Sequence, residues 1–440
     1  MVKPTPLGVP GRTLRILYIT LSYLLTPVLI GVILWRGRRN RGYWKHLGQR
    51  FGLGRRLDRP GAIWVHAVSV GEVQAAAPLV RALQRQYPER PLVITSMTPT
   101  GADRATALFG SSVDRRFVPY DLPGAVSRFF DRVRPDLAII METELWPNLF
   151  NECGRRGTPL VLASARISPR SVGRYRRLVS LFRETLSHGI VIAAQSQADA
   201  ERFQSVGAPA ARTHVTGNLK FDYELPDEVR RLGHEFRVAQ AGERPVWVAA
   251  STHAGEEAIA LAAHRQVLKR FPDAVLVLVP RHPERFTPVA EWLEREGIGH
   301  VRRSSGQQLR PDHAVFLGDT LGELMTFYAA SDVALVAGSL VPIGGHNLLE
   351  PASLGLPVLV GPHTFNSEDI ARQFLAEGAA REVYDAGTLA EAVSELLDDQ
   401  VAREAIGERG RAVVEGNRGA LSRLLELVEP LLATAPRRDV

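Results

Sequence analysis

Two short motifs place carboxylates directly after apolar runs of the chain. The run that starts at Ala62 leads into Ser-Val-Gly-Glu, which ends at Glu72. A glutamate at the junction of a buried strand and a helix faces the crevice of a parallel sheet, where it can act as a general base. A purely structural role is equally compatible with this residue, because a glutamate in a first helical turn also stabilises the helix dipole.

Glu142 and Glu144 form a second acidic motif, in the segment Met-Glu-Thr-Glu-Leu-Trp-Pro-Asn that begins at Met141. Two carboxylates two residues apart on a strand lie on one face of it. Like charges so close repel each other, and we therefore interpret the pair as functional. The alternative is one solvated carboxylate and one that caps the next helix.

Lysine is rare in this chain, which makes Lys220 in Gly-Asn-Leu-Lys-Phe mildly informative. Four of the 54 basic residues are lysines: Lys3, Lys45, Lys220 and Lys269. An ammonium group is a compact point charge, unlike the guanidinium fork. Taken alone, a solvated loop cation remains the simpler interpretation of Lys220.

The second half of the sequence carries three motifs that suit a phosphorylated ligand. Arg281 and Arg285 lie in Pro-Arg-His-Pro-Glu-Arg, and guanidiniums form paired hydrogen bonds with phosphates. Gly-Asp-Thr-Leu-Gly-Glu-Leu occupies 318–324, and a glycine-rich stretch occupies 338–351. A glycine-rich loop that leads into a helix exposes backbone N–H groups to an anion. Late in this loop, Glu350 can accept ribose hydroxyls.

Several common cofactor and metal motifs are absent from the sequence. It has no Gly-x-Gly-x-x-Gly after a strand and no Gly-x-x-x-x-Gly-Lys-Ser/Thr, so a dinucleotide cofactor and a P-loop are unsupported. It has no Gly-x-Ser-x-Gly elbow, no Asp-x-Asp pair and no His-x-x-x-His zinc pair. We therefore expect neither a cofactor nor a metal.

The apolar pattern predicts the strands that must position these motifs. Five runs in the first half are predicted to be buried strands: Ala62–Ser69, Pro91–Met97, Leu137–Met141, Pro159–Ala163 and Gly189–Ala194. The pattern restarts in the second half: Val246–Ser251, Ala274–Pro280, Ala314–Leu317, Val333–Gly338 and Pro357–Gly361. Helix-like stretches such as Gln74–Tyr87 and Pro123–Val133 separate the runs, which is typical of parallel sheets covered by helices.

Two α/β domains follow from this restart, and 440 residues are enough for two large cores. The polar segment 223–243 is predicted to link them. The other predicted parts are an N-terminal segment with its basic flank at 1–45, a first domain at 46–222, a second domain at 244–425 and a tail at 426–440. Ligands of such sheets bind at the carboxyl ends of the strands.

The segment Ile16–Trp35 contains no charged residue and is long enough, at about 1.5 Å per residue, to cross roughly 30 Å of hydrocarbon. We predict a membrane anchor. A buried core helix is one alternative, and a cleaved signal peptide would need small residues where Trp-Arg-Gly-Arg-Arg stands. Basic residues flank the segment: Lys3, Arg12 and Arg15 before it, and Arg36, Arg38, Arg39, Arg41 and Lys45 after it. This asymmetry predicts a cytoplasmic location for the remainder.

Net charge and composition indicate which classes of binding partner this protein could have. The formal net charge is +7, and an arginine-rich surface attracts phosphates and anionic lipids. Genome composition explains an arginine bias equally well. Nucleic acid is not indicated, because the sequence has no zinc-finger spacing and no interleaving of basic and aromatic residues. The single cysteine, Cys153, leaves no intrachain disulfide and suits a reducing compartment.

Six motifs together resemble the 3-deoxy-D-manno-octulosonic acid (Kdo) transferases of lipopolysaccharide assembly. They are SVGE at 69–72, METELWPN at 141–148, GNLKFD at 217–222, PRHPERF at 280–286, GDTLGEL at 318–324 and GGHNLLEP at 344–351. The resemblance extends from the N-terminal segment to about residue 420. It implies a GT-B fold, in which two Rossmann-like domains face each other across a cleft, preceded by a membrane anchor helix.

The resemblance also implies substrates and residue roles. The donor is CMP-Kdo, the acceptor is a tetraacylated lipid A precursor, and the inverting transfer takes place at the cytoplasmic face of the inner membrane. Glu72 matches the family's general base, and Glu142 and Lys220 match residues that stabilise the transition state. The donor-binding positions match Pro280, Arg281, Leu321, Gly322, Glu323, Asn347, Leu348, Leu349 and Glu350.

The residues are compatible with this chemistry. CMP leaves with one phosphate, so Arg281 and a helix N-terminus can meet its charge without a metal. The phosphates and acyl chains of the acceptor suit a basic surface beside an anchor in anionic lipid. Two alternatives remain open: a membrane-associated GT-B enzyme that uses a UDP-sugar, and a non-catalytic, membrane-tethered module that binds a nucleotide or a lipid.

Overall fold

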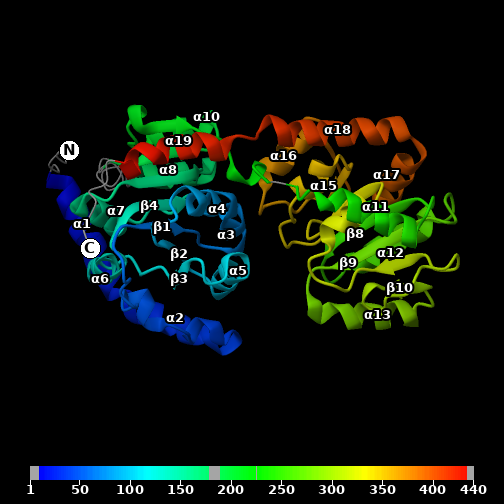
Figure 1. Cartoon of the computed structure of the whole chain (residues 1–440), viewed down its shortest axis with the longest axis horizontal. Coiled ribbons are helices and arrows are strands. Elements are labelled where there is room, and N and C mark those ends of the chain that lie inside the picture. The colour runs from blue at the N-terminus through cyan, green and yellow to red at the C-terminus, as the bar shows by residue number, and fades with distance from the viewer. Residues whose placement is uncertain (1–8, 178–188, 224, 434–440) are drawn as a thin grey trace. The chain divides into compact units, whose positions relative to one another are not determined.

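The computed structural model describes residues 9–177, 189–223 and 225–433. The chain forms two compact units, one of Met1–Asp222 with Arg418–Val440 and one of Tyr223–Asn417. In the described part of the chain, each unit is built on one seven-stranded parallel sheet with helices on its faces (Figure 1). The prediction of two parallel α/β domains is confirmed.

The first sheet has the strand order β3-β2-β1-β4-β5-β6-β7. Its strands are β1 Ala62–His66, β2 Leu92–Ser96, β3 Asp114–Phe117, β4 Pro135–Met141, β5 Leu160–Ala165, β6 Val191–Ala194 and β7 Thr213–Val215. The helices of this unit are α1 Val9–Leu24, α2 Thr26–Arg39, α3 Val70–Ala75, α4 Ala77–Gln86, α5 Pro99–Phe109, α6 Pro123–Val133, α7 Pro147–Arg156, α8 Pro169–Arg177, α10 Gln197–Ser205 and α19 Ala420–Ala433. Short 3-10 helices are η1 Arg41–Trp44, η2 Leu47–Phe51, η3 Ala210–Arg212 and η4 Leu219–Phe221.

Alternation along β1 divides the first core between the two faces of the sheet. Trp64 faces α6, where its ring lies 4.8 Å from that of Phe129 and 5.8 Å from that of Phe130. Ile63 and Val65 point to the other face, which α4, α5 and α19 cover. Because both faces are covered, β1, β4 and β5 are buried along their whole length.

The second sheet has the order β10-β11-β9-β8-β12-β13-β14. Its strands are β8 Val246–Thr252, β9 Val275–Pro280, β10 His300–Arg302, β11 Val315–Leu317, β12 Val333–Val336, β13 Val358–Val360 and β14 Ala380–Glu382. The helices are α11 Glu228–Gln240, α12 Glu256–Val267, η5 Pro283–Arg285, α13 Phe286–Arg295, η6 Arg303–Ser305, α14 Leu324–Ala329, α15 Leu349–Leu354, α16 Glu368–Ala376, α17 Ala386–Asp398 and α18 Gln400–Gly416. Trp247 packs with α12 and α17 on one face, and Val248 packs with α11 and α14 on the other.

Four strands were not predicted: β3, β7, β10 and β14. Each lies at an outer edge of its sheet and has only three or four residues. An edge strand pairs on one side only and is partly exposed, so it lacks the continuous apolar run of a central strand. In β7, for example, His214 and Val215 are exposed.

The prediction of a linker at 223–243 is wrong for most of its length. Within this segment, α11 packs against α14 of the second unit. The ring of Phe236 lies 4.9 Å from that of Phe316 and 5.3 Å from that of Phe327. The charged residues that indicated a linker form the solvent face of an amphipathic helix.

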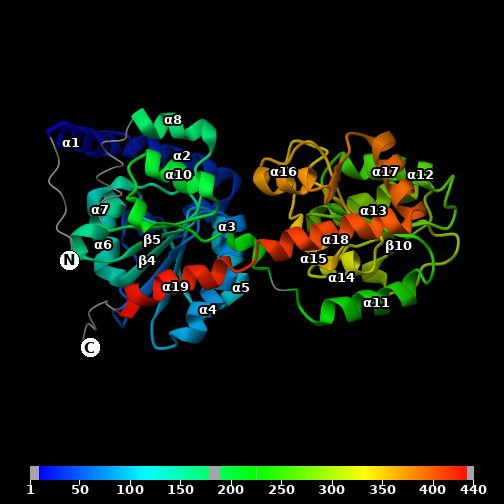
Figure 2. The ribbon, with the colours of Figure 1, turned by 90° about the horizontal axis from the view of Figure 1, so that it is seen from above.

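The predicted boundary between the second domain, at 244–425, and the tail, at 426–440, is also wrong. After α18 the chain returns at Arg418 to the first unit, and α19 covers one face of the first sheet (Figure 2). Residues 434–440 lie outside the described residues. The buried side chains of α19 are spaced four residues apart: Leu424, Val428 and Leu432. This helical spacing identifies a packed helix in place of a tail.

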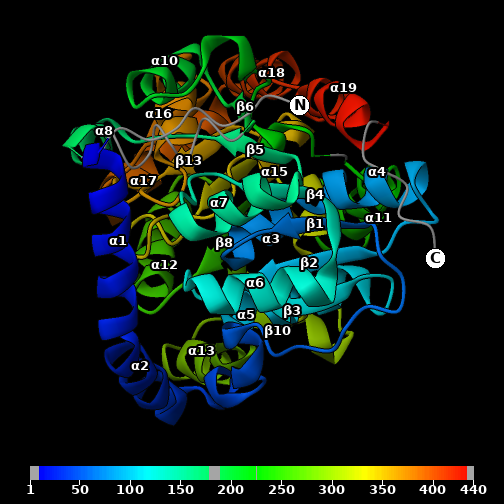
Figure 3. The same ribbon diagram turned by 90° about the vertical axis from the view of Figure 1, so that its left-hand side faces the viewer.

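The N-terminal segment forms two helices, which Figure 3 shows along one side of the first unit. Thr13–Leu24 and Thr26–Arg38 meet at a bend of 43°. Pro27, at the start of α2, lacks the N–H that would continue the ladder of α1. Among the described residues no single helix is long and apolar enough to cross a membrane, while this bent pair passes by length and composition. The anchor at Ile16–Trp35 therefore stays a prediction.

Hydrogen bonds attach α1 to the first unit. The Tyr18 hydroxyl donates to a carboxylate oxygen of Asp121 at 2.8 Å, and the Gly124 N–H donates to the Tyr23 hydroxyl at 3.4 Å. Asp121 also accepts the backbone N–H of Asn148 at the start of α7. The N-terminal helix is thus connected to the segment that carries the second acidic motif.

We predict that Asp222 holds α19 on the first unit. Its carboxylate accepts the backbone N–H groups of Gly419 and Leu421, both at 2.6 Å. Replacement of Asp222 by alanine should weaken helix docking by about 1–2 kcal/mol, which corresponds to roughly 5–30-fold faster hydrogen exchange in α19. Asp103→Ala, at an exposed position of α5, is the control. Unchanged exchange in the Asp222 variant would contradict the assignment.

Candidate active site

Glu72 lies in the first turn of α3, just beyond the carboxyl end of β1. The Ser69 hydroxyl accepts the Glu72 N–H at 3.4 Å and donates to the Glu72 carboxylate at 3.3 Å. The Val68 N–H donates to the same carboxylate at 2.8 Å. Glu72 therefore does stabilise the start of its helix, and these bonds also hold its carboxyl group in place.

The surroundings of Glu72 are those of a proton acceptor that works near neutral pH. The pKa of the Glu72 carboxyl is raised to about 7, mainly by burial, with a smaller contribution from the charges of Glu142 and Glu144, and the hydrogen bond from the Val68 N–H opposes this shift. Below this value the group is protonated, and above it the group is a carboxylate. A general base is most effective when its pKa lies near the working pH.

The prediction that Glu142 and Glu144 share one face of a strand is wrong. β4 ends at Met141, and Glu142 has a left-handed backbone with φ of 56°. The two glutamates therefore lie in the turn after the strand. Glu144 accepts a hydrogen bond from the indole of Trp146, while burial raises the pKa of its carboxyl.

An ion pair joins two of the predicted catalytic residues. Lys220 Nζ lies 3.1 Å from Glu142 Oε1, and each side chain is 22% exposed. The two residues are 78 positions apart in the sequence. Glu142 in turn raises the pKa of Glu72, so the structure places all three residues in one electrostatic group.

Three polar residues that were not predicted position the turn that carries Lys220. The Ser164 hydroxyl accepts the Leu219 N–H at 3.0 Å, and Asn218 accepts the Lys220 N–H at 3.0 Å. Gln195 donates to the Ser164 carbonyl at 2.9 Å and accepts from the Asn218 amide at 3.2 Å. Gln195 directly follows the buried strand β6 and Ser164 lies at the end of β5, and this position at the carboxyl ends of buried strands is the signal that sequence reasoning missed.

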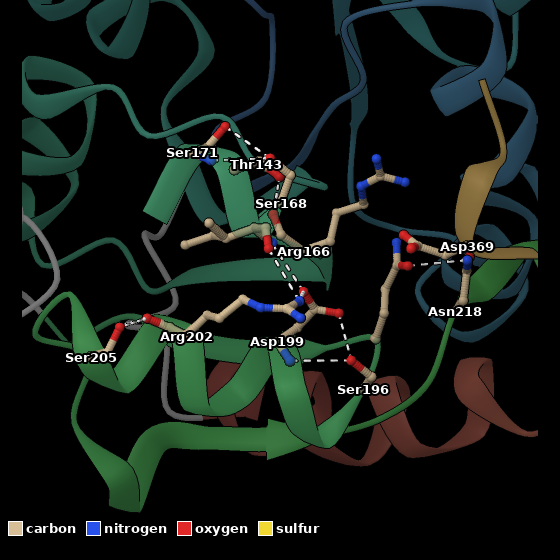
Figure 4. A network of polar contacts seen from close by, with 12 residues as sticks. Thr143, Arg166, Ser168, Ser171, Ser196, Asp199, Arg202, Ser205, Asn218 and Asp369 are labelled. Atoms are coloured by element: carbon tan, nitrogen blue, oxygen red, sulfur yellow. Dashed lines mark hydrogen bonds and ion pairs between the residues drawn. The ribbon is translucent and has the colours of Figure 1, made fainter. Parts of the chain in front are cut away.

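Polar contacts join neighbouring loops of the first unit (Figure 4). Thr143, between the two glutamates, donates to the carbonyl of Arg166 in the loop after β5. Asp199 accepts the N–H of Ile167 at 3.1 Å and the hydroxyl of Ser196 at 2.6 Å. The loops after β4, β5 and β6 therefore support one another.

In the second unit the predicted donor-binding positions follow three strands. Pro280 and Arg281 stand at the end of β9, Leu321–Glu323 follow β11, and Asn347–Glu350 follow β12. The sheet order β11-β9-β8-β12 brings these strand ends to one edge. Arg281 is exposed, and among the described side chains no acid forms an ion pair with it.

The side chains at these positions differ in their availability to a ligand. Leu321 is 71% exposed. The carboxylate of Glu323 accepts a hydrogen bond of 2.7 Å from Nη2 of Arg303, and this bond lowers the pKa of the Glu323 carboxyl. Leu348 and Leu349 are 1% exposed, so their side chains belong to the core. Contact between these two leucines and a ligand would have to involve their backbone.

The glycine-rich loop at 338–351 does not leave its early N–H groups free for an anion. The fully buried carboxylate of Glu256 accepts the N–H groups of Gly338 at 2.8 Å and Leu340 at 3.0 Å. Gly344 and Gly345 donate to the Gly338 carbonyl. The expectation of an open N–H cradle is wrong for these residues, because a buried glutamate from α12 occupies two of the donors.

Among the described residues, no group of three or more His, Cys, Asp or Glu side chains could hold a metal ion. Sequence reasoning missed two residues that can donate or accept protons. They are His253 and His346, whose Nε2 atoms lie 2.9 Å apart.

Opposite changes to the Glu142–Lys220 pair should move the titration of Glu72 in opposite directions. Glu142→Gln removes a negative charge and should lower the pKa of Glu72, whereas Lys220→Gln removes a positive charge and should raise it. Infrared titration of each variant against the same variant with Glu72→Gln measures this. Shifts of the same sign would contradict the proposed coupling.

Comparisons with known proteins agree with this architecture. Residues 45–223 match the family model "3-Deoxy-D-manno-octulosonic-acid transferase (kdotransferase)", and residues 260–413 match "Glycosyl transferases group 1". The 3-deoxy-D-manno-octulosonic acid transferase of Haemophilus influenzae is 42% identical over 95% of this chain and 99% of its own length. The Bordetella pertussis enzyme of the same name is 41% identical over 92% and 96%.

A solved structure supports the fold alone. The UDP-GlcNAc 2-epimerase of Neisseria meningitidis superimposes with a TM-score of 0.57 at 17% identity, over 84% of this chain and all of that chain. The sequence resemblance is confirmed by the two transferases that align along almost their whole length. The chain is a glycosyltransferase that belongs to the 3-deoxy-D-manno-octulosonic acid transferase family.

Proposed function

We propose that this protein transfers Kdo from CMP-Kdo to a hydroxyl of a tetraacylated lipid A precursor. Family membership supports the sugar and the reaction class. The observation that carries the mechanism is the partly buried carboxyl of Glu72, with a pKa of about 7. Such a group accepts the proton of an attacking hydroxyl and remains uncharged afterwards in an environment that disfavours charge.

In the proposed reaction the acceptor oxygen attacks the anomeric carbon of Kdo from the face opposite the phosphate. The proton of the acceptor hydroxyl passes to Glu72, the bond from the anomeric carbon to the phosphate oxygen breaks, and CMP leaves with the electron pair. Attack from the opposite face inverts the configuration. We assign stabilisation of the transition state to Glu142 and Lys220, whose ion pair adjoins the base.

The phosphate of the donor is assigned to the edge of the second sheet. Arg281 is exposed there, and a guanidinium matches a phosphate with two hydrogen bonds. The remaining donor contacts are assigned to Pro280, to Leu321–Glu323 and to Asn347–Glu350. Because the leaving nucleotide carries one phosphate, the proposal needs neither a metal nor a cofactor.

Membrane attachment at the cytoplasmic face of the inner membrane is part of the proposal. Large apolar side chains of α1 and α2 are exposed, among them Ile16 at 65% and Leu24 at 69%. Basic residues follow at Arg36, Arg38 and Lys45, where they would meet anionic lipid headgroups. An acylated acceptor could then reach the protein from the bilayer.

The direct test is to incubate the detergent-solubilised protein with CMP-Kdo and the tetraacylated precursor and to measure the mass of the lipid. We expect a gain of one or more Kdo residues. Glu72→Gln should lower the rate at least about 100-fold while CMP still binds. The matched control is Glu89→Gln, at an exposed turn. No gain in mass would contradict the proposed function, and full activity of the Glu72 variant would contradict the base.

A further inference from the structure

Two histidines share a hydrogen bond at the carboxyl edge of the second sheet. His253 follows β8, and His346 lies in the glycine-rich loop after β12. Their Nε2 atoms are 2.9 Å apart, and the rings are parallel within 7°. One Nε2 must donate and the other must accept, so at most one of the two rings is charged in this arrangement.

The surrounding backbone is shaped to hold this pair. A Cβ added to Gly338, which has φ of 72°, would lie 2.9 Å from the His346 ring and 3.6 Å from the His253 ring. Glu256 accepts the N–H of His253 at 2.9 Å and that of Gly338 at 2.8 Å. One buried carboxylate therefore fixes both segments that carry the histidines.

Burial and nearby cations favour the neutral form of both histidines. The pKa of His346 is lowered to about 4, mainly by burial and to a smaller extent by the charges of Arg281, His253 and His282. The pKa of His253 is also lowered, first by burial. The ring of His282 lies across that of His253, with centroids 5.3 Å apart.

The acids near the pair are already engaged. Glu256 and Glu257 favour the charged form of His253. The carboxylate of Glu256 is bound to backbone N–H groups, and that of Glu257 is bound to the guanidinium of Arg285 at 3.0 Å. Arg281 is the neighbouring cation left exposed, so an anion that binds to it would remove its repulsion and favour an imidazolium.

We propose that the His253–His346 pair takes up one proton when a phosphate monoester binds beside Arg281, and that the shared imidazolium offsets the second charge of the monoester. This rests on the proposed function, in which sugar transfer converts a phosphodiester with one charge into CMP. The second pKa of a phosphate monoester is near 6, so CMP carries about two charges above neutrality. The proton comes from solvent and returns to it when CMP leaves. The pair thus favours the leaving nucleotide over the intact donor.

Calorimetry of CMP binding to the full-length protein tests this proposal. Titrations at about pH 8, where free CMP is a dianion, are made in two buffers that differ in ionisation enthalpy. The difference in heat between the buffers gives the number of protons taken up. We expect uptake approaching one proton for the native protein and none with cytidine, which lacks the phosphate. His346→Gln and His253→Gln should each abolish the uptake and weaken CMP binding.

The matched control is His234→Gln, at an exposed position of α11, which should take up protons as the native protein does. Equal heats in both buffers for the native protein would overturn the proposal without any variant. Uptake that persists in both pair variants would also overturn it. Absence of CMP binding by the native protein would instead contradict the proposed function on which this inference rests.

Discussion

The partial burial of the Glu72 carboxyl group near other carboxylates is the constraint on which the candidate site of the first unit depends. Desolvation and the charges of Glu142 and Glu144 favour its protonated form, so the carboxylate persists near neutrality only because specific groups oppose these effects. The Val68 N–H binds it directly, and Lys220 offsets the charge of Glu142. A base held in this balance can accept a proton without leaving a buried charge behind.

Three residues at strand ends have a strained backbone conformation, and two of them position side chains of the candidate site. Glu142, Ser164 and Ser251 have left-handed φ values of 56°, 48° and 60° at the ends of β4, β5 and β8, a conformation that is unfavourable by roughly 1–3 kcal/mol for a non-glycine residue. At Glu142 the turn ends the strand and lets the carboxylate meet Lys220. At Ser164 it lets the hydroxyl support the turn that holds that lysine. The helices that pack on both faces of each sheet hold these strand ends in place.

The sequence predicted the central strands well and the periphery poorly, for physical reasons. A strand such as β4 is buried on both faces and reads as an unbroken apolar run, whereas β7 is short, exposed and paired on one side. The position of Glu72 after a buried strand indicated a possible base, and the family motifs gave the roles of Glu142 and Lys220. The ion pair between Glu142 and Lys220 depends on a contact across 78 residues. Glu256, His253 and His346 could not be grouped from the sequence either, because they become neighbours only when β8 and β12 pair. Helix α19 carries no functional motif, and the four-residue spacing of Leu424, Val428 and Leu432 is the only sign of its packing in the sequence.

The pH dependence of Kdo transfer tests the central claim most directly. In the proposed mechanism protonation of Glu72 removes the base, so kcat/KM should be constant above a pH of about 7 and fall about tenfold per pH unit below it. The measurement covers about pH 5 to 9, with the Glu72→Gln variant as the baseline and the titration of the substrates recorded separately. A rate that stays constant down to about pH 5.5, or whose fall is centred near the ordinary glutamate value of 4.5, would contradict the claim that a partly buried, proton-accepting Glu72 drives the reaction.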